Sequence, residues 1–393
     1  MTRRSALASL VSPLAVLAAK PASQVRLTGI EVFRVPVNKR GDWILVRLQT
    51  DAGVTGIGDA SHGRDEVTIA GLKQLWEQMR GQPCTAIEKL RQFGTPLARP
   101  AGMTGMSGAC ALSGIEQAMW DIAGQVYGVP VYELFGGALH TRIRNYANIN
   151  RATFDRSPGG FARWAERAIA DGFDAIKLAS YDGFPKDPSQ AEAHIALGTE
   201  CVMAVRKAIG PKADLLIDAH SNFTLDRGLQ LARELEPARL FWLEEVCRGI
   251  PNLARINEAA AMQTAGGESI FGVEGFHPYI AGKAADIMMP DVKYCGGMAE
   301  LKKISAMAQG AGLTISPHGP ASPVGNVAAA QVCVTLPNFL ILELGYGEVP
   351  WRAEVVDPVE PLRGGHYTLS DRPGFGFRLN DKLLASRGQR VTI

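Results

Sequence analysis

The sequence predicts an α/β fold in which an α+β domain precedes an eight-stranded β/α barrel. Short apolar runs without polar alternation recur from residue 141 onward, and a helical pattern follows each run. Such runs are typical of parallel strands that are buried on both faces. They are "RNYANIN", "FDAIKLA", "DLLIDAH", "LFWLEEV", "TAGGES", "DIMMPDV", "GLTISPH" and "FLILELG". Eight units of this kind form a closed barrel.

The segments on either side of the barrel have a different pattern. "VRLTGIEVFRVPV" and "DWILVRLQTDAGVTGIGDA" alternate apolar and polar residues and predict an antiparallel meander. Helical signals follow, and "SGIEQAMWDIAGQVYG" ends at Gly128, just before Pro130. We therefore expect an α+β domain over residues 25–140 and a barrel over residues 141–352. The hairpin-like tail, residues 353–393, is expected to return to the first domain.

Composition excludes several classes of function. The formal net charge of +2 is too small to indicate nucleic acid or an anionic membrane as the main partner. The cysteines are scattered, without a CxxC pair or a Cys/His cluster, at positions 84, 110, 201, 247, 295 and 333. A zinc site or a disulfide framework is therefore not expected. We expect a homo-oligomer, from dimer to octamer, that binds neither nucleic acid nor membrane.

Residues 1–24 predict an export signal. Arg3 and Arg4 precede an apolar stretch of small residues, then an Ala-rich segment and a proline, which is the layout of a twin-arginine signal. The apolar stretch is too short to span a membrane. We expect a periplasmic protein if this signal is used and a cytoplasmic one otherwise. A disordered extension or a misassigned start codon is the alternative.

A ladder of polar residues follows the last six apolar runs. Its members are Asp218, Glu244, Glu268, Asp291, His318 and Glu343, spaced 23 to 27 residues apart. One βα unit of a barrel takes about 30 residues. The spacing therefore predicts one polar side chain at the C-terminal end of each strand from the third to the eighth, the face that carries barrel active sites. A helix cap can explain Asp218 alone, but not six positions in register.

Asp218, Glu244 and Glu268 predict a metal site. On adjacent strands these acids repel one another unless a cation lies between them. Ligation by oxygen alone indicates a hard divalent ion, Mg²⁺ before Mn²⁺ or Ca²⁺. Glu245 is the alternative to Glu244, but alternate strand residues face opposite ways and Glu244 follows the apolar run directly.

Seven motifs together resemble those of a known family. In chain order they are "IKLA", "LLIDAHSN", "FWLEEV", "AGGES", "MMPDVKYCGG", "ISPHGP" and "LELG". They are similar to motifs of the enolase superfamily, mandelate racemase subgroup, and the resemblance covers almost everything from Val25 to the end. It implies a modified (β/α)8 TIM-type barrel with an α+β capping domain built from the N-terminal segment and the C-terminal tail. It also implies one Mg²⁺ per active site and abstraction of the proton next to a substrate carboxylate.

The resemblance assigns a role to each member of the ladder. The first three members match the metal ligands. Asp291 and His318 match a dyad in which the carboxylate orients the imidazole and raises its basicity. Glu343 matches an acid that hydrogen-bonds the substrate or the intermediate. Lys177 matches the first lysine of the family's Lys-x-Lys motif, where it neutralises the substrate carboxylate.

The chain departs from the racemase pattern at two positions. The second lysine of the motif is replaced by Ala179, which cannot move a proton. His220 stands two residues after Asp218, where racemases often have Asn, and on a continued strand both side chains point the same way. Two histidines then flank the substrate, so that one takes the α-proton while the other protonates a departing β-hydroxyl. This combination is most similar to galactonate dehydratase-like acid sugar dehydratases, with an acid sugar or another small carboxylate as substrate.

Other assignments stay open at this point. Lys177 is otherwise an ordinary surface lysine at a strand end, and His220 a structural histidine. Lys293 is a rival base but is expected to be a solvated loop residue. Arg40, Trp43 and His62 lie where family members place substrate-closing lids, and are candidates for contact with the substrate. The rival functions are an epimerase or cycloisomerase of a carboxylate or sugar lactone, and a non-catalytic sugar-binding protein.

Overall fold

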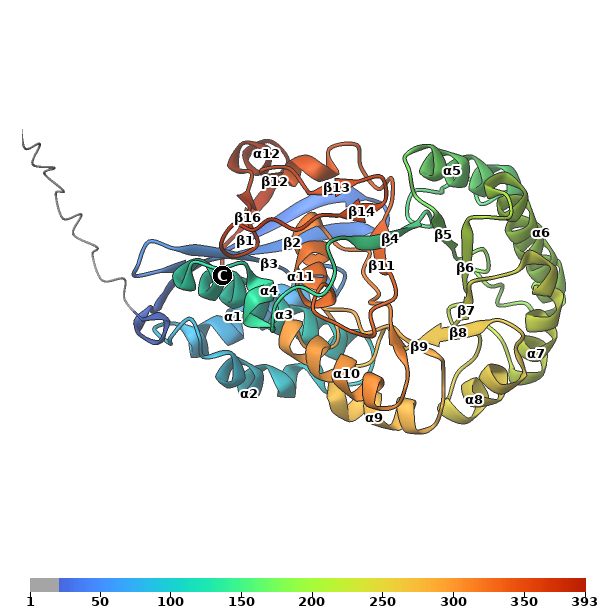
Figure 1. Cartoon of the computed structure of the whole chain (residues 1–393), viewed down its shortest axis with the longest axis horizontal. Helices are drawn as coiled ribbons and strands as arrows, with labels where there is room; N and C mark the ends of the chain where they lie inside the picture. The colour runs from blue at the N-terminus through green and yellow to red at the C-terminus, as the bar shows by residue number, and fades with distance from the viewer. Residues whose placement is uncertain (1–20) are drawn as a thin grey trace, which may run out of the picture.

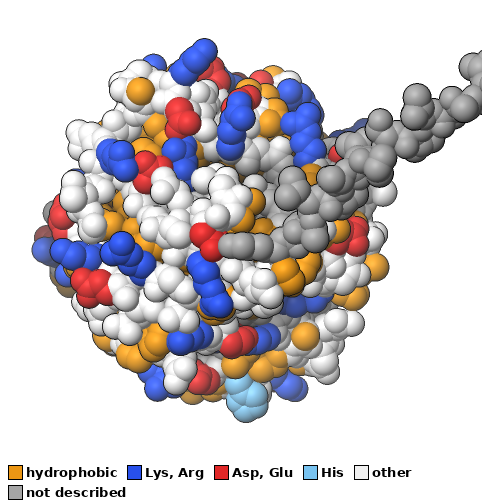
Figure 2. Space-filling view, turned by 90° about the vertical axis from the view of Figure 1, so that its left-hand side faces the viewer, with side chains coloured by type: hydrophobic (Ala, Val, Ile, Leu, Met, Phe, Trp, Pro, Cys, Tyr) orange, Lys and Arg blue, Asp and Glu red, His pale blue; other side chains and the backbone are white. Residues whose placement is uncertain are grey.

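The computed structural model describes residues 21–393, and Figure 1 shows how the elements are arranged. Most of the predicted export signal, residues 1–24, therefore lies outside the described residues. Within residues 21–393, no helix is both long enough and apolar enough to cross a membrane. On the face shown in Figure 2, Lys and Arg side chains are scattered among acidic and apolar ones, so this face presents mixed charge.

The capping domain begins with the antiparallel meander that the alternating pattern predicts. After the short η1 (Ala22–Gln24), strands β1 (Leu27–Asn38), β2 (Gly41–Thr50) and β3 (Thr55–Asp59) pair in this order. The helices that follow are α1 (Asp65–Met79), α2 (Ile87–Ala98), α3 (Met103–Tyr127) and α4 (Val131–Leu134). Helix α3 ends where the sequence predicts, because Gly128 takes the left-handed conformation (φ 72°) that glycine tolerates best.

Eight parallel strands form the barrel. They are β4 (Ile143–Asn148), β5 (Ala175–Leu178), β6 (Asp214–Asp218), β7 (Trp242–Glu244), β8 (Gln263–Gly266), β9 (Ile287–Met288), β10 (Thr314–Ile315) and β11 (Leu342–Gly345). Neighbours pair in chain order from β4 to β10, and β11 pairs with β4. A bridge from Ile315 to Phe339, just before β11, joins the remaining gap, so the barrel closes.

Helices surround the strands on the outside (Figure 1). They are α5 (Pro158–Ala170), α6 (Ala191–Ile209), α7 (Leu225–Glu234), α8 (Ile250–Ala259), α9 (Gly272–Ala281), α10 (Met298–Gly310) and α11 (Pro323–Cys333), with the short η2 (Pro188–Gln190) and η3 (Glu236–Ala238). Hydroxyl caps begin three of them, because Ser157, Thr224 and Ser322 each accept a hydrogen bond from the backbone N–H three residues on.

The tail contacts both parts of the molecule. Strand β11 is followed by the short η4 (Arg352–Val355), and then β12 (Val356–Asp357) pairs with β15 (Arg378–Leu379). Strand β14 (His366–Tyr367) pairs with β13 (Leu362–Arg363) and also with β4 of the barrel. After α12 (Asp381–Arg387), β16 (Gln389–Val391) joins the capping sheet beside β1.

Buried carboxylates fix the capping domain on the barrel. Glu116 of α3 accepts hydrogen bonds from the backbone N–H groups of Met298 and Ala299 in the first turn of α10, at 2.9 and 3.0 Å. Asp59 of β3 accepts from the backbone N–H and the hydroxyl of Ser322, before α11, at 2.9 and 2.6 Å. Each of these helices begins near the C-terminal end of a barrel strand, so the contacts hold the capping domain over that face.

We expect a valine at Gly58 to destabilise the capping domain. Gly58 lies on β3 where the strand packs directly on α3, and a Cβ there would come within 1.9 Å of the carbonyl oxygen of Gly114. Because a backbone atom cannot swing away, Gly58→Val should lower the free energy of unfolding by about 1–3 kcal/mol or more, seen as a lower urea midpoint. The control is Gly310→Ala in α10, where a Cβ meets nothing within 4 Å. A wild-type midpoint for Gly58→Val would contradict this packing.

Candidate active site

A cavity of about 440 Å³ is lined by both the capping domain and the C-terminal ends of the barrel strands. Its lining includes Arg40, His62 and Met103 from the capping domain and Asp218, His220, Glu268 and His318 from the barrel. A larger cavity, about 570 Å³, lies between α5 and the tail, and its lining includes none of the predicted site residues. We therefore place the candidate active site in the smaller cavity.

Lys177 binds the carboxylates at the centre of the site. It is the third residue of β5, and its side chain is buried. Its Nζ lies 2.7 Å from Glu244 Oε1, 3.4 Å from Glu343 Oε1 and 3.7 Å from Asp218 Oδ2. Burial alone lowers the pKa of Lys177, but these carboxylates raise it well above its ordinary value. Lys177 is therefore a buried cation and not a surface lysine.

The site holds more negative charge than Lys177 neutralises. Burial, and then the charge of Asp218, raise the pKa of Glu244 well above its usual range. Glu268 Oε2 is buried and lies 3.3 Å from His318 Nε2 without a well-formed hydrogen bond. Buried acids that raise one another's pKa are stabilised when a cation binds between them. The excess of oxygen donors therefore fits a hard divalent ion such as Mg²⁺.

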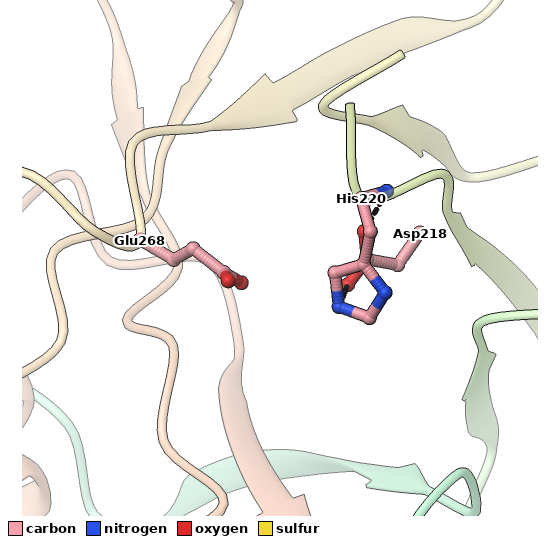
Figure 3. Close-up of side chains that lie close together, drawn as sticks. All are labelled: Asp218, His220 and Glu268. Carbon is pink, nitrogen blue, oxygen red and sulfur yellow. Dashed lines mark hydrogen bonds and ion pairs between the residues drawn. The ribbon is translucent and has the colours of Figure 1, made fainter. Parts of the chain in front are cut away.

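Asp218 and Glu268 lie close enough to share an ion, in a group with His220. One possible ligand atom from each of the three lies within 4.8 Å of the others. In Figure 3, Glu268 faces His220 and Asp218 across a gap. Glu244 is not part of this group, and both of its oxygens already accept hydrogen bonds, Oε1 from Lys177 Nζ at 2.7 Å and Oε2 from Trp242 Nε1 at 3.0 Å. The structure thus brings two of the three predicted ligands together and leaves the third beside them.

Glu245, the alternative to Glu244, lies just after β7 with a left-handed backbone (φ 40°). Its Oε1 accepts a hydrogen bond from the backbone N–H of Gly267 at 2.9 Å. Burial, and then the charge of Glu268, raise the pKa of Glu245 to about 7. Both glutamates therefore border the acid cluster.

Asp291 and His318 form a hydrogen-bonded pair. Asp291 Oδ2 lies 2.7 Å from His318 Nδ1, so His318 Nε2 is the nitrogen that faces Glu268. Burial lowers the pKa of His318, but the charges of Glu268, Glu343 and Asp291 raise it, to about 9. A protonated imidazole here is thus favoured by the surrounding acids.

Lys293 stands behind this pair. Its Nζ donates to both oxygens of Asp291, at 2.9 and 2.8 Å, and its side chain is fully buried. The expectation of a solvated loop lysine is therefore wrong. The backbone N–H of Lys293 also donates to Asp291 Oδ1 at 2.7 Å, and this tight turn directs the lysine inward.

Glu343 of β11 connects the lysine to the imidazole. Its Oε1 accepts from Asn148 Nδ2 at 2.6 Å, and its Oε2 accepts from the backbone N–H of Gly319 at 3.0 Å. His318 Nε2 lies 3.8 Å from the same Oε2. Burial raises the pKa of Glu343, but Lys177 and His318 outweigh this effect and lower it. The carboxylate is therefore held ionised between two cationic groups.

His220 reaches the site through a strained turn. Strand β6 ends at Asp218, and His220 and Ser221 both have left-handed φ angles, 46° and 54°. Each such residue costs about 1–3 kcal/mol, and they concentrate at functional sites. The Nε2 of His220 lies 2.9 Å from Asp218 Oδ2. The two side chains therefore share one side because of this turn, and not because the strand continues.

The ring of His220 has a second acidic neighbour that the sequence did not reveal. Its Nδ1 lies 2.5 Å from Asp182 Oδ1, and Asp182 belongs to the loop after β5. Asp218 and, to a smaller extent, Asp182 raise the pKa of His220 to about 12.

Ala179, at the start of this loop, is buried, and Arg156 donates a hydrogen bond to its carbonyl oxygen.

The three lid candidates separate into two kinds. Arg40 and His62 line the cavity. Burial, and then the charge of Arg151, lower the pKa of His62 well below its usual value, so this imidazole is neutral. Trp43 is fully buried, packs edge-on against Trp351 at 5.6 Å and is not part of the lining. The expected contact of Trp43 with the substrate therefore has no support in the cavity lining.

Comparison with known families places the chain among enzymes with this barrel. Residues 160–383 match the family model "Enolase C-terminal domain-like". Residues 26–136 match "Mandelate racemase / muconate lactonizing enzyme, N-terminal domain". A solved structure of a mandelate racemase/muconate lactonizing enzyme-like protein from Rubrobacter xylanophilus superimposes with a TM-score of 0.84 at 31% identity, covering 93% of this chain and 98% of the other.

Three curated relatives carry specific names. D-xylonate dehydratase of Haloferax volcanii is 31% identical over 86% of this chain and 83% of its own length. D-galactonate dehydratase of Ralstonia pickettii is 29% identical over 93% of this chain and 95% of its own. D-galactarolactone cycloisomerase of Agrobacterium fabrum is 30% identical over 87% of this chain and 90% of its own.

We expect Lys177→Met to destabilise the metal-free protein. The substitution leaves buried carboxylates without their cation, which typically costs about 3–5 kcal/mol. Urea denaturation in EDTA should therefore show a clearly lower midpoint. Lys186→Met, at an exposed position in the loop after β5, is the matched control and should keep the wild-type midpoint. If both variants unfold together with the wild type, Lys177 does not neutralise the cluster.

Proposed function

Because the chain belongs to the enolase superfamily, in its mandelate racemase subgroup, we propose that it is a hydro-lyase that acts on an acid sugar. The enzyme is Mg²⁺-dependent, removes the proton next to the carboxylate of an aldonate and eliminates the β-hydroxyl, giving a 2-keto-3-deoxy acid. The two relatives named as dehydratases support this reaction class. The observation that carries the proposal is that His318 and His220 both line the cavity, while position 179 holds alanine.

The acid cluster would hold a divalent ion near the carboxylate end of the substrate. Asp218, Glu244 and Glu268 would hold Mg²⁺, which when bound stabilises the negative charge that develops on the substrate carboxylate. Lys177 pairs with an oxygen of the substrate carboxylate in this proposal, and it would do so by exchanging a contact with one of the acids that now surround it. Glu343, between Lys177 and His318, hydrogen-bonds the substrate or the intermediate.

His318 is the base in this proposal. Its Nδ1 is held by Asp291, which directs Nε2 toward the site. The acids that raise the pKa of His318 in the metal-free protein would be neutralised by a bound cation, which would lower this pKa. The neutral imidazole then takes the proton from C2. The electron pair of the broken C–H bond first delocalises into the substrate carboxylate as an enediolate, which can take a proton back. It forms the C2–C3 double bond when the C3 hydroxyl leaves.

His220 is the acid that makes the hydroxyl leave. Hydroxide is a poor leaving group, so elimination requires a proton donor at the C3 oxygen. The imidazolium of His220 supplies this proton and water departs. The enol that results tautomerises to the 2-keto-3-deoxy acid.

A racemase, epimerase or cycloisomerase is the second candidate, and the relative named as a cycloisomerase favours it. Such a reaction does not expel the β-hydroxyl as water, so it needs no acid at position 220. Incubation with Mg²⁺ and a set of acid sugars that includes D-galactonate, D-xylonate and D-gluconate separates the two. A dehydratase yields 2-keto-3-deoxy acids, whereas an isomerase returns products of unchanged mass. A sugar-binding protein binds these compounds without Mg²⁺ and releases them unaltered.

Activity should depend on a divalent ion. We expect EDTA to abolish turnover and Mg²⁺ to restore it, because the acid cluster needs a cation to bind the substrate carboxylate. Glu268→Gln should lose both turnover and the Mg²⁺ binding seen by calorimetry. Glu274→Gln, an exposed glutamate on α9, is the control and should keep both. Full turnover in EDTA would exclude a metal-dependent mechanism.

The two histidines should separate in an isotope experiment. We expect His318→Asn to lose exchange of the substrate α-proton with D₂O, because nothing at position 179 can take that proton. We expect His220→Asn to slow dehydration while exchange continues, since proton abstraction precedes loss of the hydroxyl. Losses at a general acid or base are typically about 10²–10⁴-fold. NMR of the substrate measures exchange, and a colour reaction for 2-keto-3-deoxy acids measures dehydration.

Either half of this assignment can be contradicted separately. Wild-type exchange in His318→Asn would mean that another group takes the proton, with Lys177 the first to test. Undiminished dehydration in His220→Asn would remove the acid role and favour the isomerase.

A further inference from the structure

Asp182 lies behind His220, in the loop that joins β5 to α6, and does not line the cavity. We propose that Asp182 is the positioning residue of His220, and that the two form a second carboxylate–imidazole pair that serves the elimination step alone. The inference rests on the proposed dehydratase function and adds to it a residue that acts through the acid. Their contact is 2.5 Å, between Asp182 Oδ1 and His220 Nδ1.

The loop that carries Asp182 is held in place by the residue before it. Tyr181 is buried, its hydroxyl lies 3.2 Å from Thr199 Oγ1, and its ring packs edge-on against Phe223 at 5.2 Å. The carbonyl oxygen of Tyr181 accepts a hydrogen bond from Asn222 Nδ2 at 3.4 Å. Because Asn222 follows His220 in the chain, this bond ties the loop of the carboxylate to the loop of the imidazole.

The backbone of His220 is fixed independently of Asp182. Its N–H donates to Asp218 Oδ1 at 2.9 Å, and the N–H of Ser221 donates to the carbonyl oxygen of Glu245 at 2.5 Å. The remaining freedom of His220 is rotation of the ring. Asp182 holds Nδ1, so Nε2 is the nitrogen that faces Asp218 and the acid cluster. A carboxylate on one ring nitrogen thus sets the direction of the other.

Asp182 also separates the ring from two arginines. Its Oδ2 lies 3.4 Å from Nη2 of Arg40, which comes from the capping domain, and 3.4 Å from Nη2 of Arg156. Asn150 Nδ2 donates to the same oxygen at 3.0 Å. Guanidinium groups have donors only, as does the ring N–H. Without the carboxylate, donors would face donors, so the ring would be displaced.

This arrangement predicts different effects on the two chemical steps. Asp182 contacts His220 and its neighbours, whereas His318, after β10, is held by Asp291, after β9. Removing the Asp182 carboxylate should therefore disturb elimination and leave proton abstraction intact. Outer carboxylates that orient an imidazole are typically worth about 10–100-fold in activity.

The kinetic test uses D-galactonate or D-xylonate, whichever the Mg²⁺-loaded enzyme turns over. In Asp182→Asn we expect formation of the 2-keto-3-deoxy acid to fall about 10–100-fold, while exchange of the α-proton with D₂O stays near the wild-type rate. Asp187→Asn is the matched control, because Asp187 lies in the same loop, is exposed and caps η2 through the N–H of Ser189 at 2.9 Å. It should keep both rates. An equal loss of both reactions in Asp182→Asn would show a merely structural role and overturn the proposal.

A spectroscopic test does not depend on turnover. In Mg²⁺-loaded protein labelled with ¹⁵N-histidine, the Nδ1–H of His220 should give a low-field proton resonance, as expected for a hydrogen bond to a carboxylate. The resonance should be absent from His220→Asn, lost or shifted upfield in Asp182→Asn, and retained in Asp187→Asn. If Asp182→Asn does not fold, the ¹⁵N shift of the His220 resonance in the wild type decides, because it identifies the nitrogen that bears the proton as Nδ1, which faces Asp182, or Nε2, which faces Asp218. A resonance that persists in folded Asp182→Asn would overturn the pair.

With both tests, a failure of this inference can be distinguished from a failure of the proposed function. If no acid sugar is dehydrated, the proposed function fails, and the resonance still shows whether Asp182 holds the ring. If the enzyme dehydrates an acid sugar and Asp182→Asn does so at the wild-type rate, the inference alone fails.

Discussion

The ammonium of Lys177 allows acids from three strands to be buried at one end of the barrel. It lies within 4 Å of carboxylate oxygens on β6, β7 and β11. Taken out of water without a cation, these groups would bind protons or the strand ends would separate. One lysine cannot balance all of them, and the charge that remains would favour the divalent ion of the proposed function. The same electrostatic constraint would thus govern both the metal-free fold and the binding of that ion.

The sequence predicts much of the site because, in a barrel, residues spaced by one βα unit lie at the same end of neighbouring strands. Asp218 and Glu244 follow apolar runs 26 residues apart, and consecutive parallel strands bring such positions to the same end. The docking of the capping domain has no comparable signal. Glu116 looks like one more polar residue within a long helix, and its contact with the first turn of α10 joins positions that are 182 residues apart. Pattern within a segment does not reveal such pairings.

Loop residues of the site were missed or misjudged for a related reason. Asp182 lies in a segment without periodicity, so nothing in the sequence directs it toward His220. Lys293 stands two residues after Asp291, so on a continued strand both side chains would point the same way. A lysine after a strand normally reaches solvent, however, and the tight turn at Asp291 is what directs this one inward. His220 points to the same side as Asp218 because of a left-handed turn, which the alternation of side chains along a strand does not describe. Periodicity predicts positions on strands and helices, while turns re-aim the side chains that follow.

The two imidazoles of the site are supported by different parts of the molecule. His318 is held by Asp291 within the barrel, and its side chain is 10% exposed. His220 is 36% exposed and is held by Asp182, which also contacts Arg40 of the capping domain. In the proposed reaction the base is therefore oriented by a residue of the barrel, while the residues around the acid include Arg40, from the turn between β1 and β2 of the capping domain. Because the acid acts at C3, the turn that carries Arg40 would influence the leaving-group end of the substrate. A change of sequence in that turn would then alter the elimination step, but not the binding of the carboxylate or the removal of the α-proton.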